Sequence, residues 1–152
     1  MKKLMTILAI LFTGVVSAQN LERTADEFTG KVTISTSFNN TVILHKSITE
    51  FGTKYYLSLH AKGSTCIVDG AGVYIKLDDN TNLIKTKEEI DIEVNDSGGY
   101  TYSAFVTLTP AEVKILTTKT IIRYKLYVFT NEVLGSEAIK FKDEVAEILT
   151  MV

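Results

Sequence analysis

Residues 55–61 read Tyr-Tyr-Leu-Ser-Leu-His-Ala, and apolar side chains occupy every second position of this stretch. The apolar series is Tyr55, Leu57, Leu59 and Ala61, and the positions between them carry Tyr56, Ser58 and His60. Successive side chains of a strand point to opposite faces of a sheet, so a period of two indicates a strand with one face on the core. We therefore predict a half-buried β-strand here.

The same alternation recurs along most of the chain on both sides of this strand. It is found at 31–38, 73–77, 90–94, 100–108 and 122–128, and less regularly at 42–48. Turn-forming sequences separate these runs, namely Asn39-Asn40, Asp69-Gly70, 78–82 and 95–99. Short strands joined by short turns predict a mostly-β domain built as an antiparallel β-sandwich, with a closed β-barrel as the alternative.

Two segments depart from this pattern and predict helices. Thr109-Pro110-Ala111-Glu112 combines a capping box with proline at the first helical position, which predicts a short helical turn near 109–116. A longer amphipathic helix is predicted over 136–151, with Ser136 after Gly135 as its cap. Its apolar stripe comprises Ala138, Phe141, Val145, Ile148, Leu149 and Val152, and its polar side comprises Lys140, Lys142, Asp143, Glu144 and Glu147. We expect the stripe to pack on the core, with docking on a partner protein as the alternative.

The first residues of the chain have the three-part pattern of a signal peptide. Met1-Lys2-Lys3 is followed by an apolar run, 4–16, and then by Val16-Ser17-Ala18, with small residues at the positions that a signal peptidase reads. The run is shorter than the about 20 apolar residues of a membrane-spanning helix, so an N-terminal anchor is the less favoured alternative. We predict a signal peptide over 1–18 and one mature domain over 19–152 that is exported, either periplasmic or secreted.

Charge and cysteine content argue against several classes of function. The 152-residue chain carries 16 basic and 18 acidic side chains without a basic block, which argues against a nucleic-acid surface. Cys66 is the only cysteine, so neither an internal disulfide nor a cysteine-cluster metal site is available. It lies in the apolar run Cys66-Ile67-Val68, and we expect its thiol to be buried, with pairing to another chain as the alternative. Neither a nucleophile-elbow motif nor a phosphate-binding glycine loop is present, and we expect no cofactor.

A series of short motifs runs through nearly the whole mature chain. In order they are Asp26-Glu27-Phe28-Thr29-Gly30, a tyrosine-rich strand near Tyr55, Leu77-Asp78-Asp79-Asn80, Leu108-Thr109-Pro110-Ala111-Glu112, the strand 121–129 and Phe141-Lys142-Asp143. This order resembles small exported β-sandwich proteins of Gram-negative bacteria. The resemblance implies the fold and an exported location, and it transfers no functional residue.

Candidate metal ligands occur at the spacing of a calcium-binding loop. Asp78, Asn80, Asn82 and Glu89 fall at positions 1, 3, 5 and 12 of an EF-hand. Position 6, which needs glycine for its sharp turn, is Leu83, and strands rather than helices flank the segment. We therefore expect a polar hairpin tip and keep calcium binding as the weaker interpretation.

Histidines and carboxylates offer little catalytic pattern. His45 and His60 are the only histidines, and each lies in a predicted strand, where we expect it to face solvent. Asp91 and Glu93 share one face of a predicted strand. A pair of carboxylates could suggest glycoside hydrolysis, which requires two carboxyl groups that face each other across a cleft. We expect them on the solvated side of an edge strand.

Three tyrosines are the candidate binding residues. Tyr56 and Tyr74 occupy the polar side of their strands, and Tyr127 is placed with them. If the strands are neighbours, the rings form an exposed ladder suited to a sugar ring or a protein partner, because each ring brings area and each hydroxyl a hydrogen bond. The alternative is that the second sheet or the C-terminal helix covers them.

Three functions are compatible with these patterns. The favoured one is a non-enzymatic exported β-sandwich that binds a protein or glycan at the cell envelope. A small apolar-ligand carrier of barrel type is the second, and an enzyme whose carboxylates converge only in space is the third.

Export and cleavage give the first prediction. In the protein recovered from the exporting cell we expect Gln19 as the first residue, because Ala18 is the small residue at the cleavage position. N-terminal sequencing together with intact mass measures this directly. An N-terminus that precedes Ala18 would contradict it.

Overall fold

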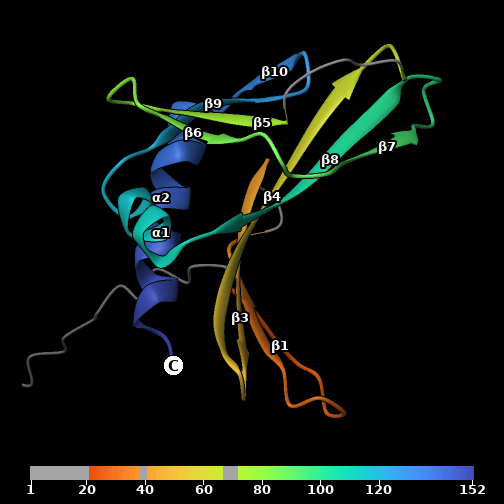
Figure 1. Cartoon of the computed structure of the whole chain (residues 1–152). Helices are drawn as coiled ribbons and strands as arrows, with labels where there is room; N and C mark the ends of the chain where they lie inside the picture. The colour runs from red at the N-terminus through yellow and green to blue at the C-terminus, as the bar shows by residue number, and fades with distance from the viewer. Residues whose placement is uncertain (1–20, 38–40, 67–71) are drawn as a thin grey trace, which may run out of the picture.

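A computed structural model of the chain describes residues 21–37, 41–66 and 72–152 (Figure 1). The predicted signal peptide, 1–18, its predicted cleavage site between Ala18 and Gln19, and the predicted turns at Asn39-Asn40 and Asp69-Gly70 lie outside the described residues. The strands and helices follow the alternation and the helical spacing of the sequence closely enough that most predicted elements are found.

The larger sheet has six strands in the order β1-β2-β3-β4-β8-β7, and every neighbouring pair is antiparallel. Its strands are β1 (Glu22–Ala25), β2 (Val32–Ser35), β3 (Val42–Thr49), β4 (Gly52–Gly63), β7 (Ile90–Val94) and β8 (Tyr100–Leu108). The alternation in 55–61 therefore belongs to the long strand β4, which lies in the middle of this sheet. Only the short strand β1 was not expected from the sequence.

The smaller sheet has four strands in the order β10-β9-β5-β6, again all antiparallel. Its strands are β5 (Val73–Leu77), β6 (Asn82–Lys85), β9 (Ile121–Leu126) and β10 (Phe129–Glu132). The single strand predicted through 122–128 is wrong, because the chain turns at Tyr127 and Val128 and returns as β10. Tyr127 takes the left-handed backbone conformation, with φ of 54°, which a strand residue does not adopt.

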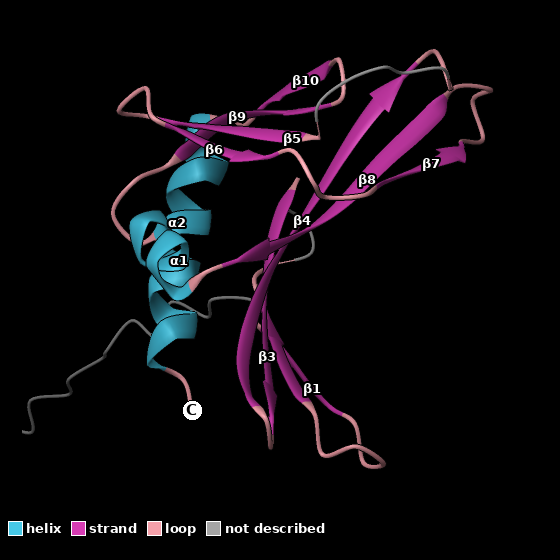
Figure 2. Cartoon of the chain, in the orientation of Figure 1, coloured by secondary structure: helices cyan, strands magenta, loops and turns pink. Residues whose placement is uncertain are grey.

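The two sheets and two helices are arranged as an open sandwich (Figure 2). The four-stranded sheet covers one end of the inner face of the six-stranded sheet, and the helices α1 (Pro110–Leu116) and α2 (Gly135–Thr150) lie beside both sheets. The predicted mostly-β antiparallel sandwich with a C-terminal helix is confirmed. A closed barrel is wrong for the described strands, because β1, β7, β10 and β6 are free sheet edges.

Aromatic side chains join the inner faces of the sheets. Tyr102 of β8 is fully buried and stacks on Phe129 of β10, with ring centroids 4.6 Å apart. Gly63 permits this approach, since a Cβ there would lie 2.5 Å from the Phe129 ring. Tyr124 of β9 is also buried, and its hydroxyl donates to the backbone carbonyl of His60 in β4. Buried hydroxyls need such partners, so Tyr124 ties one sheet to the other.

The predicted capping box of α1 is confirmed. Thr109 Oγ1 accepts from the Glu112 N–H at 3.2 Å, and Glu112 Oε2 accepts from the Thr109 N–H at 2.8 Å. The predicted cap of α2 is wrong, because this helix begins at Gly135 and its N-cap, Leu134, makes no side-chain cap bond. The Leu134 carbonyl accepts the first helical bond, from the Ala138 N–H at 2.8 Å.

The apolar stripe of α2 packs on the core, as expected, except for Val152, which lies beyond the end of the helix and is exposed. Ala138, Phe141, Val145 and Ile148 are buried, and the helix contacts β3 of one sheet and β9 of the other. Glu144 differs from expectation, since it is fully buried rather than on the polar side. Its Oε2 accepts from the Ser37 N–H at 3.2 Å, and Lys140 lies 3.6 Å from its other oxygen. Burial of this carboxylate is offset by both contacts.

Lys46 of β3 caps the C-terminal end of α2. Its side chain is on the inner face and buried, and its ammonium donates to the carbonyls of Ile148, at 3.2 Å, and Met151. The last turn of α2 contains no basic residue of its own, so this cation from the sheet satisfies carbonyls that the helix leaves unpaired. Burial lowers the pKa of the Lys46 ammonium from its ordinary value.

Removal of this cation is expected to destabilise the sandwich. Lys46→Met keeps the apolar stem but leaves the helix carbonyls without a donor, and we expect a loss of about 1–3 kcal/mol in the free energy of unfolding. Urea denaturation measures the change. Lys54→Met, on the exposed side of the neighbouring strand, is the matched control and should cost well under 1 kcal/mol, as surface substitutions do. Equal costs for the two variants would contradict this role for Lys46.

Candidate functional site

The outer face of the four-stranded sheet carries two cross-strand rows of side chains. The register gives Glu132, Arg123, Lys76 and Asn82 in one row and Thr130, Lys125, Tyr74 and Ile84 in the other. The opposite faces of the same strands carry the buried residues Val73, Ile75 and Leu126. We call the residues Tyr74, Lys76, Asn82, Arg123, Lys125 and Thr130 the basic face.

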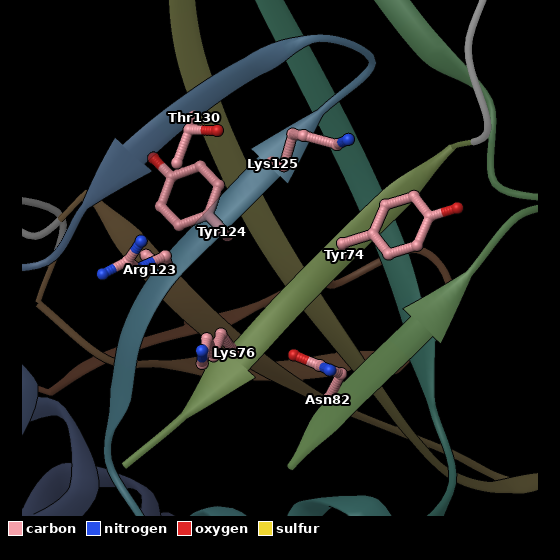
Figure 3. A pocket seen from close by; sticks show the side chains of 7 residues that line it. All are labelled: Tyr74, Lys76, Asn82, Arg123, Tyr124, Lys125 and Thr130. Atoms are coloured by element: carbon pink, nitrogen blue, oxygen red, sulfur yellow. The ribbon is translucent and has the colours of Figure 1, made fainter. Parts of the chain in front are cut away.

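The basic face forms a shallow depression of about 220 Å³ (Figure 3). Lys76, Arg123 and Lys125 supply three positive charges, and Glu132 is the one acidic side chain in the two rows. The Glu132 carboxylate lies 3.4 Å from Arg123 Nε, and both side chains are about half exposed, at 64% and 48%. An ion pair between exposed groups such as these contributes little to the free energy of folding, so Arg123 remains able to bind another anion.

An aromatic ring lies among these cations. The Lys125 ammonium is 5.0 Å from the centre of the Tyr74 ring, within the range of a cation–π contact. This contact places Lys125 beside the ring and leaves the Tyr74 hydroxyl at the rim of the depression (Figure 3). Together the charges and the ring can hold an anionic group and an apolar or planar surface next to it.

Tyr56 lies on a different surface, the outer face of the six-stranded sheet. Its ring stacks on Phe105 of β8, with centroids 5.0 Å apart and planes 25° apart, and Phe105 is 53% exposed. The His45 ring lies 5.4 Å from the Phe105 ring. These aromatic side chains border a second depression, also lined by Lys31, Thr33 and Ser47.

His45 is held between two hydroxyls on that surface. Its Nδ1 is 2.8 Å from Ser35 Oγ and its Nε2 is 3.1 Å from Ser58 Oγ. Burial lowers the pKa of His45 from its ordinary value of 6.5, which favours the neutral ring. His60 is exposed, as expected, and its Nδ1 is 3.0 Å from Ser103 Oγ. His45 is half-buried, so the expectation that it faces solvent is wrong.

The predicted tyrosine ladder does not form. Tyr56 is in β4 and Tyr74 is in β5, and these strands belong to different sheets whose outer faces point away from one another. Tyr127 is in the turn before β10 and packs edge-on against the buried Tyr102 ring, at 6.4 Å and 83°. Tyr74 alone of the three lies in the depression shown in Figure 3.

The candidate calcium ligands are dispersed. Asp78 Oδ2 accepts from the N–H and hydroxyl of Thr120, at 3.2 and 2.9 Å, and Asn80 lies in the turn with φ of 66°. Asn82 is in β6 on the basic face, and Glu89 precedes β7 with an exposed side chain. The described part of the chain contains no group of three or more His, Cys, Asp or Glu side chains placed to hold a metal ion.

Carboxylates elsewhere take structural positions. Asp91 and Glu93 are exposed on the edge strand β7, as expected. Hydrogen bonds and an ion pair with Lys119 lower the pKa of Asp79 to about 2, and the bonds from Thr120 lower that of Asp78. Such carboxyls are ionised at neutral pH and serve as hydrogen-bond acceptors for the turn rather than as proton donors.

Cys66 is exposed, contrary to expectation. It follows the end of β4, and interaction with its thiol raises the pKa of the Tyr100 hydroxyl from its ordinary value. The apolar run that suggested burial begins only after it, at residues outside the described range. The three cations of the basic face were also not predicted as a site, although Arg123 and Lys125 stand two positions apart on one strand face, as do Tyr74 and Lys76.

Comparison with protein-family models, with curated proteins and with solved structures finds no match to this chain. Among the described residues, neither helix has the length and apolar character needed to cross a bilayer. Function is therefore inferred from the surfaces described above.

The burial of His45 has a consequence for stability. Because its folded pKa lies below the value of 6.5 in the unfolded chain, the unfolded state binds the proton first, and stability is lost as pH falls through about 6.5. We expect the free energy of unfolding to fall less between pH 7.5 and 5.5 in His45→Gln than in the unaltered protein. Urea denaturation at several pH values tests this, with His60→Gln as the exposed control. A His45→Gln variant that keeps the full pH dependence would contradict it.

Proposed function

We propose that the protein is a non-enzymatic, exported binding module that takes an acidic group of a protein or glycan at the cell envelope on its basic face. The observation that carries the proposal is that Lys76, Arg123, Lys125 and Tyr74 lie in two adjacent cross-strand rows and line one depression, with Lys125 over the Tyr74 ring. Export is part of the proposal and rests on the N-terminal sequence pattern.

Charge distribution supports an acidic ligand. The chain as a whole has a formal charge of −2, so a surface with three cations and one carboxylate departs in sign from the rest of the molecule. A local patch of one sign raises the concentration of oppositely charged groups near it and speeds their association. Arg123 adds a planar donor array that matches carboxylate, sulfate or phosphate.

Rigidity supports binding with little loss of conformational entropy. Lys76, Arg123 and Lys125 are on β5 and β9, which are the two central strands of the sheet. Residues of the same strands that point inward are fully buried, among them Ile75, Leu77 and Leu126. Side chains on such a support are already positioned before a ligand arrives.

The two other functions have less support. A barrel-type carrier would need a closed barrel around an apolar cavity, and the described strands form two open sheets. An enzyme of the expected kind would need two carboxyls across a cleft with one raised pKa. In the part of the chain that the structure describes, the carboxyls with clearly shifted pKa values all shift downward, and they are Asp26, Asp78, Asp79 and Glu112.

The Tyr56–Phe105 pair favours a second candidate function. Two stacked rings beside a depression lined by hydroxyls provide a platform for an uncharged sugar ring. This surface lacks the cluster of cations found on the basic face, so the two candidates differ in the charge of the ligand that they favour.

Binding to acidic and neutral polysaccharides tests the proposal. We expect the protein expressed from the whole 152-residue sequence to bind polygalacturonate more tightly than dextran, and binding to weaken as salt rises. In Lys76→Glu/Lys125→Glu affinity should fall at least tenfold, or about 1.4 kcal/mol. Isothermal titration calorimetry measures these affinities, and an acidic polypeptide, polyglutamate, is tested in parallel by the same method.

Matched variants make the result specific. Lys87→Glu/Lys114→Glu reverses two exposed lysines away from the face and should leave affinity unchanged. Failure to bind either polyanion, or equal loss in both charge-reversed variants, would contradict the proposed site. Preference for dextran that is lost in Tyr56→Ala would instead favour the second candidate.

A further inference from the structure

Two phenylalanines are exposed at one end of the molecule. Phe28 is 100% exposed and Phe51 is 92% exposed. Phe28 lies in the connection between β1 and β2, and Phe51 lies in the tight turn between β3 and β4. The two turns border one depression, so the rings belong to a single surface rather than to separate loops. We call the residues Asp26, Glu27, Phe28, Glu50 and Phe51 the hairpin tip.

The hairpin tip is acidic as well as aromatic. Each phenylalanine directly follows a glutamate, in Glu27-Phe28 and in Glu50-Phe51. Asp26 adds a third carboxylate, and Lys31 is the one cation within the two turns. Large apolar side chains gathered on an exposed surface mark a docking site, and the adjacent carboxylates favour a partner surface that is positively charged.

The backbone of the turn that carries Phe28 is well bonded. Asp26 Oδ1 accepts from the N–H groups of Phe28 and Thr29, at 2.9 and 3.3 Å, and the Gly30 N–H donates to the Asp26 carbonyl at 2.8 Å. Gly30 has φ of 64°, a left-handed backbone conformation that glycine adopts without steric cost because it has no Cβ. A turn ordered in this way loses little backbone freedom on binding.

A surface of complementary chemistry is present on the same molecule. The basic face offers three cations, the Tyr74 ring and the aliphatic Ile84 beside a depression. Figure 1 shows the β1–β2 connection and the β3–β4 turn at the bottom of the molecule and the four-stranded sheet at the top. The basic face points away from the sandwich, because its strands turn their buried side to the core. The two surfaces therefore point toward opposite ends.

We propose that the hairpin tip of one copy docks on the basic face of a second copy, so that the chains associate head to tail. This inference rests on the proposed function, because it names the occupant of the same site. Glu27 and Glu50 pair with Lys76, Lys125 and Arg123, while the phenylalanine rings cover Tyr74 and the stems of the lysines. A docked pair keeps one free hairpin tip on one copy and one free basic face on the other, so association is heterologous and continues beyond a dimer.

A bilayer fits the hairpin tip less well than this surface does. Three carboxylates next to two rings oppose approach to an anionic membrane, and a zwitterionic lipid surface carries no net positive charge to attract them. The basic face supplies opposite charges and aromatic area together.

Sedimentation equilibrium of the protein expressed from the whole sequence tests the inference. We expect the weight-average mass to rise with concentration past that of two copies, and to fall when salt is raised. The tip variant Phe28→Ala/Phe51→Ala and the face variant Lys76→Glu/Lys125→Glu should each weaken association at least tenfold. Leu134→Ala/Ile139→Ala, which removes two exposed apolar side chains elsewhere, is the control for the tip variant and should associate like the unaltered protein.

Mixing the two variants gives the decisive result. The tip variant keeps an intact face and the face variant keeps an intact tip, so an equimolar mixture should form dimers and nothing larger. A single-copy mass at every concentration, association unaffected by the tip variant, or a mixture that stays monomeric would overturn the inference.

Polyanion binding separates this inference from the function on which it rests. A protein that stays monomeric yet binds polygalacturonate or polyglutamate through Lys76 and Lys125 keeps the proposed function and loses the head-to-tail inference. A protein that does neither loses both. A vesicle co-sedimentation arm with phosphatidylcholine is run on the same tip variant, and binding lost in that variant would also count against the inference.

Discussion

The packing of α2 against both sheets is the contact on which the rest of the structure depends. Its buried stripe touches β3 on one side and β9 on the other, so the helix fills the open side of the sandwich. Apolar burial alone does not fix the position of a helix along its axis. Here Lys46 donates to carbonyls at its C-terminal end, Glu137 accepts from Thr41 in its first turn, and Glu144 accepts from Ser37 near its middle.

Alternation within the strands follows from the same arrangement. Once the inner faces are committed to the core, every second residue of β4, β5, β8 and β9 points to solvent. The outer faces are then free to differ, and they do so in charge and aromatic content. One sheet presents Tyr56 with Phe105, and the other presents Tyr74 with three cations.

Features of the fold that depend on residues close in the chain could be predicted from the sequence, whereas those that depend on which strands and helices lie side by side could not. Alternation at 55–61 and the capping box at Thr109 depend on near neighbours in the chain, and the structure bears out both. The prediction of a tyrosine ladder was wrong because it depended on which strands are neighbours. Alternation shows which face of a strand a residue occupies, but it does not show which strand lies beside it. The prediction that Glu144 lies on the polar side of the helix was wrong for a related reason, since its buried carboxylate accepts from Ser37, 107 residues away in the chain. The cations of the basic face are visible in the sequence as Arg123 and Lys125, but Lys76 and Tyr74 join them only through the β5–β9 register.

The two opposite surfaces are linked mechanically through the core. Tyr124 belongs to the strand that presents Arg123 and Lys125, and its hydroxyl donates to the His60 carbonyl of β4. Asn131 of β10 donates to that same carbonyl at 2.7 Å. Strand β4 begins at the turn that carries Phe51, so one continuous strand runs from the hairpin tip to these bonds. A partner held on the basic face therefore fixes the direction of the hairpin tip as well, because no flexible connection separates the two among the described residues. Head-to-tail association of many copies in one direction requires this fixed orientation of the hairpin tip relative to the basic face. Binding of a soluble ligand to the basic face alone does not require it.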